Sequence, residues 1–338
     1  MVETAASQEA GAPHRDTLIA FYRQMVLIRR FEEAAAVQYQ RRKIGGFLHL
    51  YIGEEAVAVG AVDTLLPQDT IVAHYREHGH ALARGADPNA VMAELFGRAT
   101  GVSKGKGGSM HLYDAGRGFL GGYAIVAGHL PIAVGLAMAH KHRNDNGICL
   151  AFFGDGAVNE GEFHEALNLA AVWKTPVLFL CENNLYGMGT ALERAAAVPE
   201  VYKRARAYDI PAERCNGMDV REIHAAATKA AGYVRTEKKP YLLEAMCYRF
   251  RGHSMADPEL YREKDEVARW RERDPITRLR SELLENGQAT DEELNAIDAA
   301  VEQQVDEAVR FADASPEPAA EELWTDVYVG VARESHHA

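Results

Sequence analysis

The stretches ICLAFFGDG (residues 148–156) and PVLFLCENN (residues 176–184) decide the fold. Each is an uninterrupted apolar run that ends in polar residues, and residues 160–173 between them have the apolar spacing of a helix. Apolar strands that alternate with helices are typical of a parallel sheet covered on both faces. The sequence therefore predicts an α/β fold in which these two strands are neighbours.

The polar ends of the two strands predict a binding site. Asp155 follows the first strand, and Asn184 follows the second 29 positions later, as one strand–helix–strand unit requires. Open α/β sheets bind ligands at this edge. Carboxylate and amide oxygens suit Mg²⁺, which also takes phosphate oxygens and water, and glycines at 154 and 156 allow close phosphate approach. We therefore expect a magnesium–diphosphate site.

The rest of the chain extends the same pattern. Apolar periodicity and turn residues predict further strands at 70–74 and 241–246 and helices at 16–40, 54–66, 89–96, 129–142 and 220–234. Glycine-containing turns are expected at 101–109 and 121–126, a polar loop at 249–263 and charged helices at 275–311. We predict a parallel sheet with helices on both faces and with N- and C-terminal helical extensions, divided into a disordered tail (1–15), an α/β domain (16–270) and a helical C-terminal extension (271–338).

Composition narrows the class of protein. The 338 residues are 47% hydrophobic and 25% charged, as in ordinary globular chains, and the net charge of −12 disfavours nucleic acid as a partner. The four cysteines form no CxxC pair, which favours buried free thiols in a reducing compartment. The N-terminus lacks the pattern of a targeting signal, and no apolar run reaches membrane-spanning length. We expect a cytoplasmic protein without a membrane partner.

Three further motifs carry a resemblance to a known family. They are KGKGGSMH at 104–111, ENNLYGMGT at 182–190 followed by ERA at 193–195, and YRFRGHSMADP at 248–258. Together with GDG at 154–156, they resemble the thiamine diphosphate-dependent 2-oxo acid dehydrogenases, specifically the alpha subunit of the decarboxylating first component, and most of all the pyruvate-specific members. The resemblance covers roughly residues 16–325.

The resemblance implies a cofactor and the residues that bind it. Thiamine diphosphate and Mg²⁺ would be the cofactors, and residues 16–270 would be the diphosphate-binding module. Asp155, Asn184 and the carbonyl of Tyr186 would be the metal ligands. The other implied cofactor contacts are Gly156 and Ala157 at the diphosphate, the clamp residues Tyr75 and Arg76, and the backbone of Ala124 and Val126 at the aminopyrimidine ring.

Two histidines match the family's active-site positions. His49 lies in an FLHLY stretch after a glycine turn, of which residues 47–49 look exposed, and His253 lies in the polar loop after the last strand. The resemblance implies that both are catalytic and that His253 also contacts the cofactor. Histidine suits these roles because it moves protons near neutral pH. The roles of four other histidines stay open: His78, His80, His111 and His129.

The resemblance also implies partners. A beta subunit would supply the carboxylate that activates the cofactor, in a heterotetramer of two alpha and two beta chains. Pyruvate would be the substrate, and the lipoyl domain of the dihydrolipoyl acyltransferase would accept the acetyl group. Two alternatives stay open: the alpha subunit of a branched-chain 2-oxo acid or acetoin dehydrogenase, or a non-catalytic scaffold with the same fold. HSMADP at 253–258 favours pyruvate, and the intact polar residues argue against the scaffold.

The loop at 104–108 also invites another interpretation. KGKGG is rich in glycine and lysine, as are loops that bind nucleotide phosphates. The spacing of the phosphate-binding motif is absent, because Lys106 is followed by glycine rather than by serine or threonine. We therefore predict an ordered loop near the edge of the cofactor site.

Overall fold

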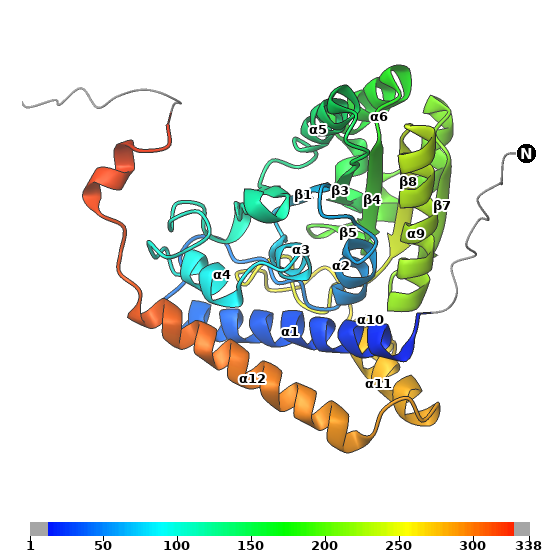
Figure 1. The fold of residues 1–338 in the computed structure, drawn as a ribbon. Coiled ribbons are helices and arrows are strands. Elements are labelled where there is room, and N and C mark those ends of the chain that lie inside the picture. Colours follow the sequence, from blue (N-terminus) through cyan, green and yellow to red (C-terminus); the bar gives the residue numbers. More distant parts are fainter. Residues whose placement is uncertain (1–12, 328–338) are drawn as a thin grey trace, which may run out of the picture.

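A computed structural model describes residues 13–327 and shows a six-stranded sheet in which every paired strand is parallel (Figure 1). The strand order is β2-β1-β3-β4-β8-β7. The two stretches that decide the fold are the neighbouring central strands β3 and β4, as predicted. The bounds are β1 Thr70–His74, β2 Phe119–Tyr123, β3 Cys149–Gly154, β4 Val177–Asn183, β7 Ala212–Asn216 and β8 Tyr241–Met246, with a small antiparallel hairpin formed by β5 Tyr186–Gly187 and β6 Thr190–Ala191.

Helices connect the strands and extend the domain at both ends. Short 3-10 turns occupy several loops, among them residues 155–159 directly after β3. The α-helices are α1 Arg15–Gln40, α2 Glu55–Val62, α3 His78–Ala83, α4 Pro88–Leu95, α5 Leu130–Arg143, α6 Gly161–Trp173, α7 Leu192–Ala195, α8 Val201–Arg204, α9 Val220–Glu237, α10 Lys264–Arg271, α11 Pro275–Glu285 and α12 Asp291–Ala314.

The alternation of side chains along the strands explains why helices cover both faces. In β3, Leu150 and Phe152 belong to the core that also contains residues of α1, α2 and α9, whereas Ala151 and Phe153 belong to the core that contains residues of α5 and α6. Successive side chains of a strand point to opposite faces, and here both sets are apolar. The predicted α/β architecture is thereby confirmed.

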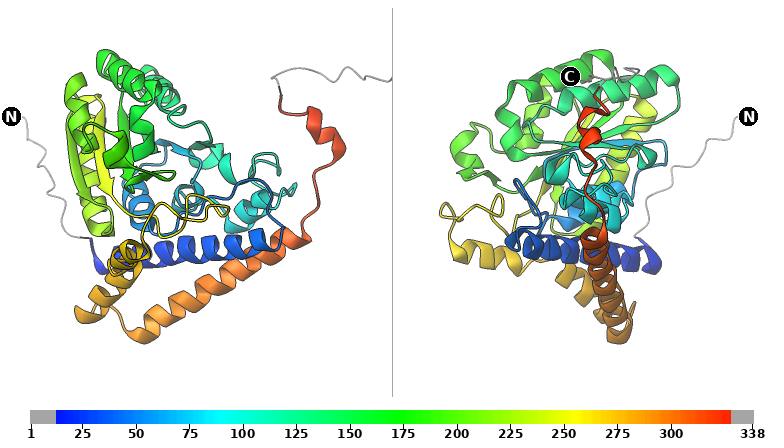
Figure 2. Two further views of the ribbon diagram at one scale, coloured as in Figure 1. Left: turned by 180° about the vertical axis from the view of Figure 1, so that it is seen from behind. Right: turned by 90° about the vertical axis from the view of Figure 1, so that its left-hand side faces the viewer.

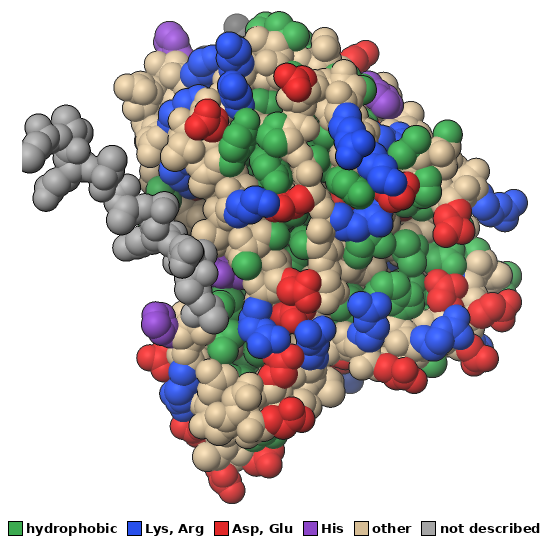
Figure 3. Space-filling model, turned by 90° about the vertical axis from the view of Figure 1, so that its right-hand side faces the viewer, with side chains coloured by type: hydrophobic (Ala, Val, Ile, Leu, Met, Phe, Trp, Pro, Cys, Tyr) green, Lys and Arg blue, Asp and Glu red, His purple; other side chains and the backbone are tan. Residues whose placement is uncertain are grey.

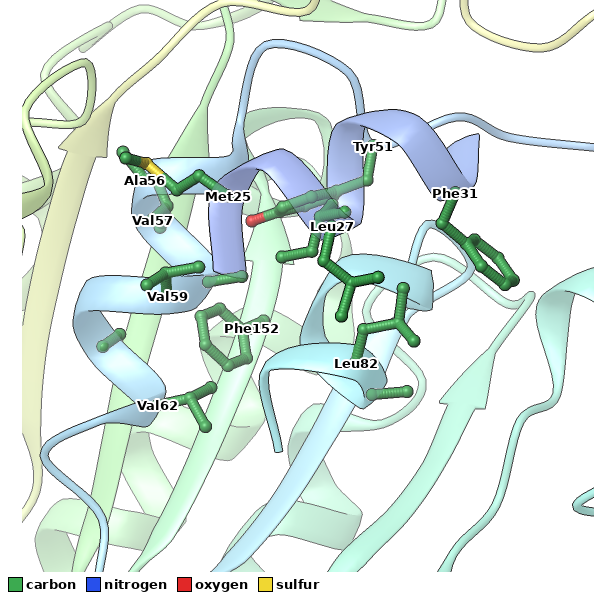
Figure 4. Close-up of a cluster of buried hydrophobic side chains, with 14 of the residues drawn as sticks. Met25, Leu27, Phe31, Tyr51, Ala56, Val57, Val59, Val62, Leu82 and Phe152 are labelled. Atoms are coloured by element: carbon green, nitrogen blue, oxygen red, sulfur yellow. The ribbon is translucent and has the colours of Figure 1, made fainter. Parts of the chain in front are cut away.

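Figure 4 shows the core on the first face, where helices from the first part of the chain meet the sheet. Met25 and Phe31 of α1, Val59 of α2, Leu82 of α3 and Phe152 of β3 are buried members of this core. Burial of such a side chain contributes roughly 1.5–3 kcal/mol relative to exposure. This packing fixes α2 and the preceding loop, which carry residues close to the sheet edge.

The terminal helices form the predicted extensions. Helix α12 packs against α1 and α4 beneath the sheet (Figures 1 and 2). Its start is fixed by a capping box, in which Thr290 and Glu293 each accept a hydrogen bond from the other's backbone N–H. After α12 the chain extends away from the helices and Asp326 pairs with Lys104 and Lys106.

Several sequence predictions need correction. The helix predicted at 54–66 is α2, which ends at Val62, and the glycine turn predicted at 121–126 begins inside strand β2. Strand β7 was missed. Both β2 and β7 are edge strands, so neither carries the continuous apolar sequence that marks a strand buried between neighbours. Of the predicted disordered tail, residues 1–12 lie outside the described residues and Arg15 already begins α1.

Three further properties concern the cysteines, the apolarity of the helices and the side chains at the surface. All four cysteines are free, and three of them are buried. Within residues 13–327, none of the helices combines the length and apolarity needed to cross a membrane. On the face shown in Figure 3, acidic and basic side chains are interspersed among apolar ones.

Candidate active site

A cavity of about 510 Å³ lies at the carboxyl edge of the sheet. It is lined by residues from the ends of β1, β3 and β4 and from the loops that follow β2 and β8. The structure brings every residue that we predicted for the site to this one cavity: His49, Tyr75, Arg76, Ala124, Val126, Asp155, Gly156, Ala157, Asn184, Tyr186 and His253.

Asp155 and Asn184 meet as the crossover predicts. The register of β3 and β4 pairs Gly154 with Glu182, so both polar residues leave the sheet at the same edge. The backbone N–H of Asn184 donates to Asp155 Oδ1 at 3.3 Å. Oδ2 of Asp155 is buried without a hydrogen-bond partner among the described residues, and burial raises the pKa of this carboxyl to about 7.

These features fit a metal ion. A buried carboxylate with one unpartnered oxygen is destabilised by desolvation, and a bound cation relieves that cost. Asn184 supplies an amide oxygen, and Tyr186 begins the β5–β6 hairpin directly above the turn. Gly156 allows the hairpin to approach, because a Cβ there would lie 3.0 Å from the Cα of Gly187. The donors are oxygens, as Mg²⁺ requires.

Arg76 lies between the sheet edge and the loops. Its Nη1 donates to the Leu50 carbonyl at 3.0 Å, and its Nη2 donates to the His253 carbonyl at 2.9 Å. Nε lies 3.7 Å from a carboxylate oxygen of Glu54. The Arg76 side chain is 3% exposed, so its guanidinium is a fixed positive charge in the cavity wall that suits a phosphate.

His49, His253 and Tyr75 form an aromatic group in the cavity wall, which we call the histidine end. The ring centroids are 5.1 Å apart for the two histidines, and Tyr75 lies 4.6 Å from His49 and 5.6 Å from His253. Nδ1 of each histidine is buried without a partner in the described chain. Burial and the charge of Arg76 lower the pKa of His49 to about 2 and that of His253 to about 3.

The prediction that residues 47–49 are exposed is wrong for Leu48 and His49. The stretch 47–49 looks exposed, but only Phe47 is exposed, at 62%, whereas Leu48 is buried and His49 is 6% exposed. The cause is tertiary, because the Leu48 carbonyl accepts from Met255 N and the Leu50 carbonyl accepts from Arg76. The loop that carries His253 therefore covers the loop that carries His49.

Asp257 shapes the loop of His253. Its carboxylate accepts from the backbone N–H of His253 at 2.6 Å, from that of Glu259 at 2.9 Å and from the Tyr261 hydroxyl at 2.6 Å. These hydrogen bonds lower the pKa of Asp257 although burial opposes them. The loop thus has a defined shape set by one carboxylate.

Sequence reasoning missed a buried polar network beneath the cavity. Glu182, which directly precedes the two asparagines, accepts from His74 Nε2 at 2.6 Å, from His80 Nε2 at 2.9 Å and from the hydroxyl of Tyr51. The Arg76 backbone N–H donates to Nδ1 of His74. The signal was a glutamate at the end of a buried strand, which needs donors from elsewhere in the chain.

The other histidines left open by the sequence have structural partners. Nε2 of His129 donates to the Phe152 carbonyl at 2.7 Å, and Nδ1 of His111 lies 3.2 Å from the Gly122 carbonyl. His78 bridges Glu32 and Ser109, and its pKa is raised by Glu32 although burial opposes it. Of these three side chains, only His129 lines the cavity.

The KGKGG loop is ordered around a carboxylate of the chain itself. Glu94 is fully buried and accepts from the backbone N–H groups of residues 103, 105, 107 and 108 at 2.7–3.1 Å. Such a ring of backbone donors resembles a phosphate-binding nest, but here the anion is internal. This arrangement leaves no reason to assign a nucleotide to the loop.

Comparison with known proteins decides the family. The family model described as dehydrogenase E1 component matches residues 23–321. The chain belongs to the dehydrogenase E1 component family. Members of this family depend on thiamine diphosphate.

Relatives within the dehydrogenase E1 family match almost the whole chain. A pyruvate dehydrogenase E1 component subunit alpha from Rickettsia bellii is 47% identical over 318 residues, which cover 94% of this chain and 97% of the relative. The protein of the same name from Zymomonas mobilis is 49% identical over 318 residues, 94% of this chain and 90% of its own. That from Rhizobium meliloti is 48% identical over 307 residues, 90% of this chain and 88% of its own.

Proposed function

We propose that this chain is the alpha subunit of a pyruvate dehydrogenase E1 component. It would catalyse oxidative decarboxylation of pyruvate and transfer the acetyl group to a lipoyl group of the acyltransferase component. The observation that carries the proposal is the single cavity that gathers all predicted site residues, in a chain 47–49% identical to proteins named for this activity. Free thiols favour a reducing compartment, so we place the enzyme in the cytoplasm.

The sheet edge would hold the metal and the diphosphate. Asp155, Asn184 and the carbonyl of Tyr186 would bind Mg²⁺, whose charge would relieve the buried carboxylate. Gly156 and Ala157 at the turn after β3 would contact the diphosphate through their backbone. Three further groups complete the proposed cofactor contacts, namely the clamp of Tyr75 and Arg76, the backbone of Ala124 and Val126, and His253.

The histidine end would handle the substrate. When bound, thiamine diphosphate supplies a nucleophilic carbon and an electron sink for loss of carbon dioxide. His49 and His253 are neutral at working pH because their pKa values are lowered. Each neutral imidazole carries one N–H and can therefore donate a hydrogen bond to a substrate oxygen at this end.

The cavity needs a partner chain to be complete. Val126 and Met188 line it, yet they are 40% and 68% exposed, and neighbouring Ile125 is 73% exposed. Apolar side chains exposed at the mouth of a polar cavity are typical of an interface. A beta subunit covering this rim would bring the activating carboxylate, and we propose a heterotetramer of two alpha and two beta chains.

Reconstitution tests the proposal. The purified chain with Mg²⁺ and thiamine diphosphate should not turn over pyruvate, and addition of a beta subunit should restore turnover. A panel of pyruvate, branched 2-oxo acids and acetoin should give the highest kcat/KM for pyruvate. Activity of the chain alone would contradict the two-chain claim, preference for another substrate would favour the branched-chain or acetoin enzymes, and absence of cofactor binding to the complex would favour a non-catalytic scaffold.

A further inference from the structure

Glu54 lies directly behind the two groups assigned to the metal and the diphosphate. It immediately precedes α2 and is 1% exposed. Its Oε1 accepts from Asn184 Nδ2 at 2.9 Å, and its Oε2 lies 3.7 Å from Nε of Arg76. Oε2 has no hydrogen-bond partner within residues 13–327, and Glu54 does not line the cavity. Glu54 therefore contacts Asn184 and lies close to Arg76 from behind the cavity wall, without facing the cavity itself.

The contact with Asn184 sets the direction of the amide. An asparagine side chain has a donating and an accepting end, and an ionised carboxylate can only accept. Glu54 therefore holds the Nδ2 end of Asn184. The opposite end, Oδ1, accepts from the Tyr186 N–H at 3.3 Å. That end faces the segment that carries the proposed carbonyl ligand, which is the orientation a metal requires.

The contact with Arg76 adds a second constraint. Two of the guanidinium nitrogens are held by the carbonyls of Leu50 and His253, and the third faces Glu54. All three partners belong to this chain, so the position of the charged group is fixed before any ligand arrives. Burial and the charge of Arg249 lower the pKa of Arg76, and the nearby carboxylate of Glu54 opposes that effect.

We propose that Glu54 is a positioning residue of this site, which fixes the orientation of the Asn184 amide and the place of the Arg76 guanidinium. The inference rests on the proposed function, because it assumes that Asn184 binds Mg²⁺ and that Arg76 binds the diphosphate. It goes beyond that function by assigning a role to a side chain that neither lines the cavity nor contacts the cofactor.

Variants of the reconstituted alpha–beta complex test this role. In Glu54→Ala, the amide of Asn184 loses its acceptor and is free to turn, so the Mg²⁺ concentration for half-maximal thiamine diphosphate binding should rise at least about tenfold. Glu54→Asp should do the same because its carboxylate is one methylene short. Glu54→Gln should stay within about threefold of wild type, because its Oε1 still accepts from Nδ2.

Glu55 provides a matched control. It is the next residue, is fully buried and pairs with Arg29 and the Gly53 N–H, away from the cavity. Glu55→Gln removes a buried charge from the same helix end and should leave the Mg²⁺ requirement unchanged. Binding of Mn²⁺, followed by its electron paramagnetic resonance spectrum, gives a readout that is independent of turnover and should weaken only in Glu54→Ala and Glu54→Asp.

The possible outcomes distinguish a failure of the positioning role of Glu54 from a failure of the proposed function. Wild-type Mg²⁺ dependence in both Glu54→Ala and Glu54→Asp would overturn the positioning role, and so would a Glu54→Gln complex as weak as Glu54→Ala. Assembly with the beta subunit on gel filtration shows which variants are folded, and Glu54→Asp decides the matter if Glu54→Ala does not assemble. If the wild-type complex itself shows no Mg²⁺-dependent binding, the proposed function fails and not the role of Glu54 alone.

Discussion

The two ends of the cavity are built in different ways. Asp155 and Asn184 follow neighbouring central strands whose register places them together. His49 and His253 lie on loops that approach each other through hydrogen bonds between backbones and from Arg76. The metal end is therefore part of the sheet, whereas the histidine end depends on how two loops are held. Changes at the first end should affect cofactor binding, and changes at the second should affect turnover.

The largest effect is expected at the metal end. Asp155→Asn keeps the shape but removes the charge that a cation needs, so the affinity of the alpha–beta complex for thiamine diphosphate with Mg²⁺ should fall at least about 100-fold. Isothermal titration calorimetry at a fixed Mg²⁺ concentration measures this affinity for thiamine diphosphate. An affinity within threefold of wild type would show that the metal lies elsewhere.

Changes to the histidines at the histidine end should lower the turnover rate. His253→Ala removes the ring, but the carbonyl that accepts from Arg76 remains. We expect kcat for pyruvate to fall about 100-fold while cofactor affinity changes only a few-fold. His164→Ala, which changes an exposed histidine of α6, is the control and should behave as wild type. Unchanged kcat in His253→Ala would remove its catalytic assignment.

The difference between the two ends also explains what the sequence could predict. Strands β3 and β4 are apolar on both faces. Their strand conformation, their adjacency in the sheet and the proximity of Asp155 to Asn184 therefore follow from the sequence pattern and spacing alone. The edge strands β2 and β7 lack that pattern and were not recognised. His49 and His253 were found only through resemblance, and His49 was wrongly expected to be exposed. Glu54 was not found, because its partner Asn184 lies 130 positions away.

A smaller effect is expected from the carboxylate that shapes the loop of His253. Asp257→Ala removes three hydrogen bonds within that loop. We expect kcat to fall about tenfold, and limited proteolysis within 252–262 to become faster, because the loop loses its defined shape. Equal proteolysis rates in wild type and variant would show that the loop is held by other contacts.

The smallest effect concerns His129, a cavity-lining histidine bonded to the sheet. Burial lowers its pKa from 6.5 to about 3, so below pH 6.5 the unfolded chain binds a proton that the folded chain excludes. Its contribution to stability is therefore lost as pH falls from about 6.5 towards 3. His129→Gln, which keeps a donor for Phe152, should reduce the pH dependence of the free energy of unfolding by about 1 kcal/mol per pH unit between pH 6 and 5.

Urea unfolding at pH 7, 6 and 5 measures this dependence. His142→Gln changes an exposed histidine near the end of α5 and should keep the wild-type dependence. The same dependence in His129→Gln and wild type would mean that His129 is protonated in the folded chain.

The most direct test of the central claim is the Mg²⁺ dependence of thiamine diphosphate affinity in the alpha–beta complex, measured for wild type, Asp155→Asn and His253→Ala. If the sheet edge holds the metal and the loops serve the substrate, Asp155→Asn should lose the dependence and His253→Ala should keep that of wild type. A complex in which Asp155→Asn keeps the dependence, or in which His253→Ala loses it to the same extent, would contradict this division of the site.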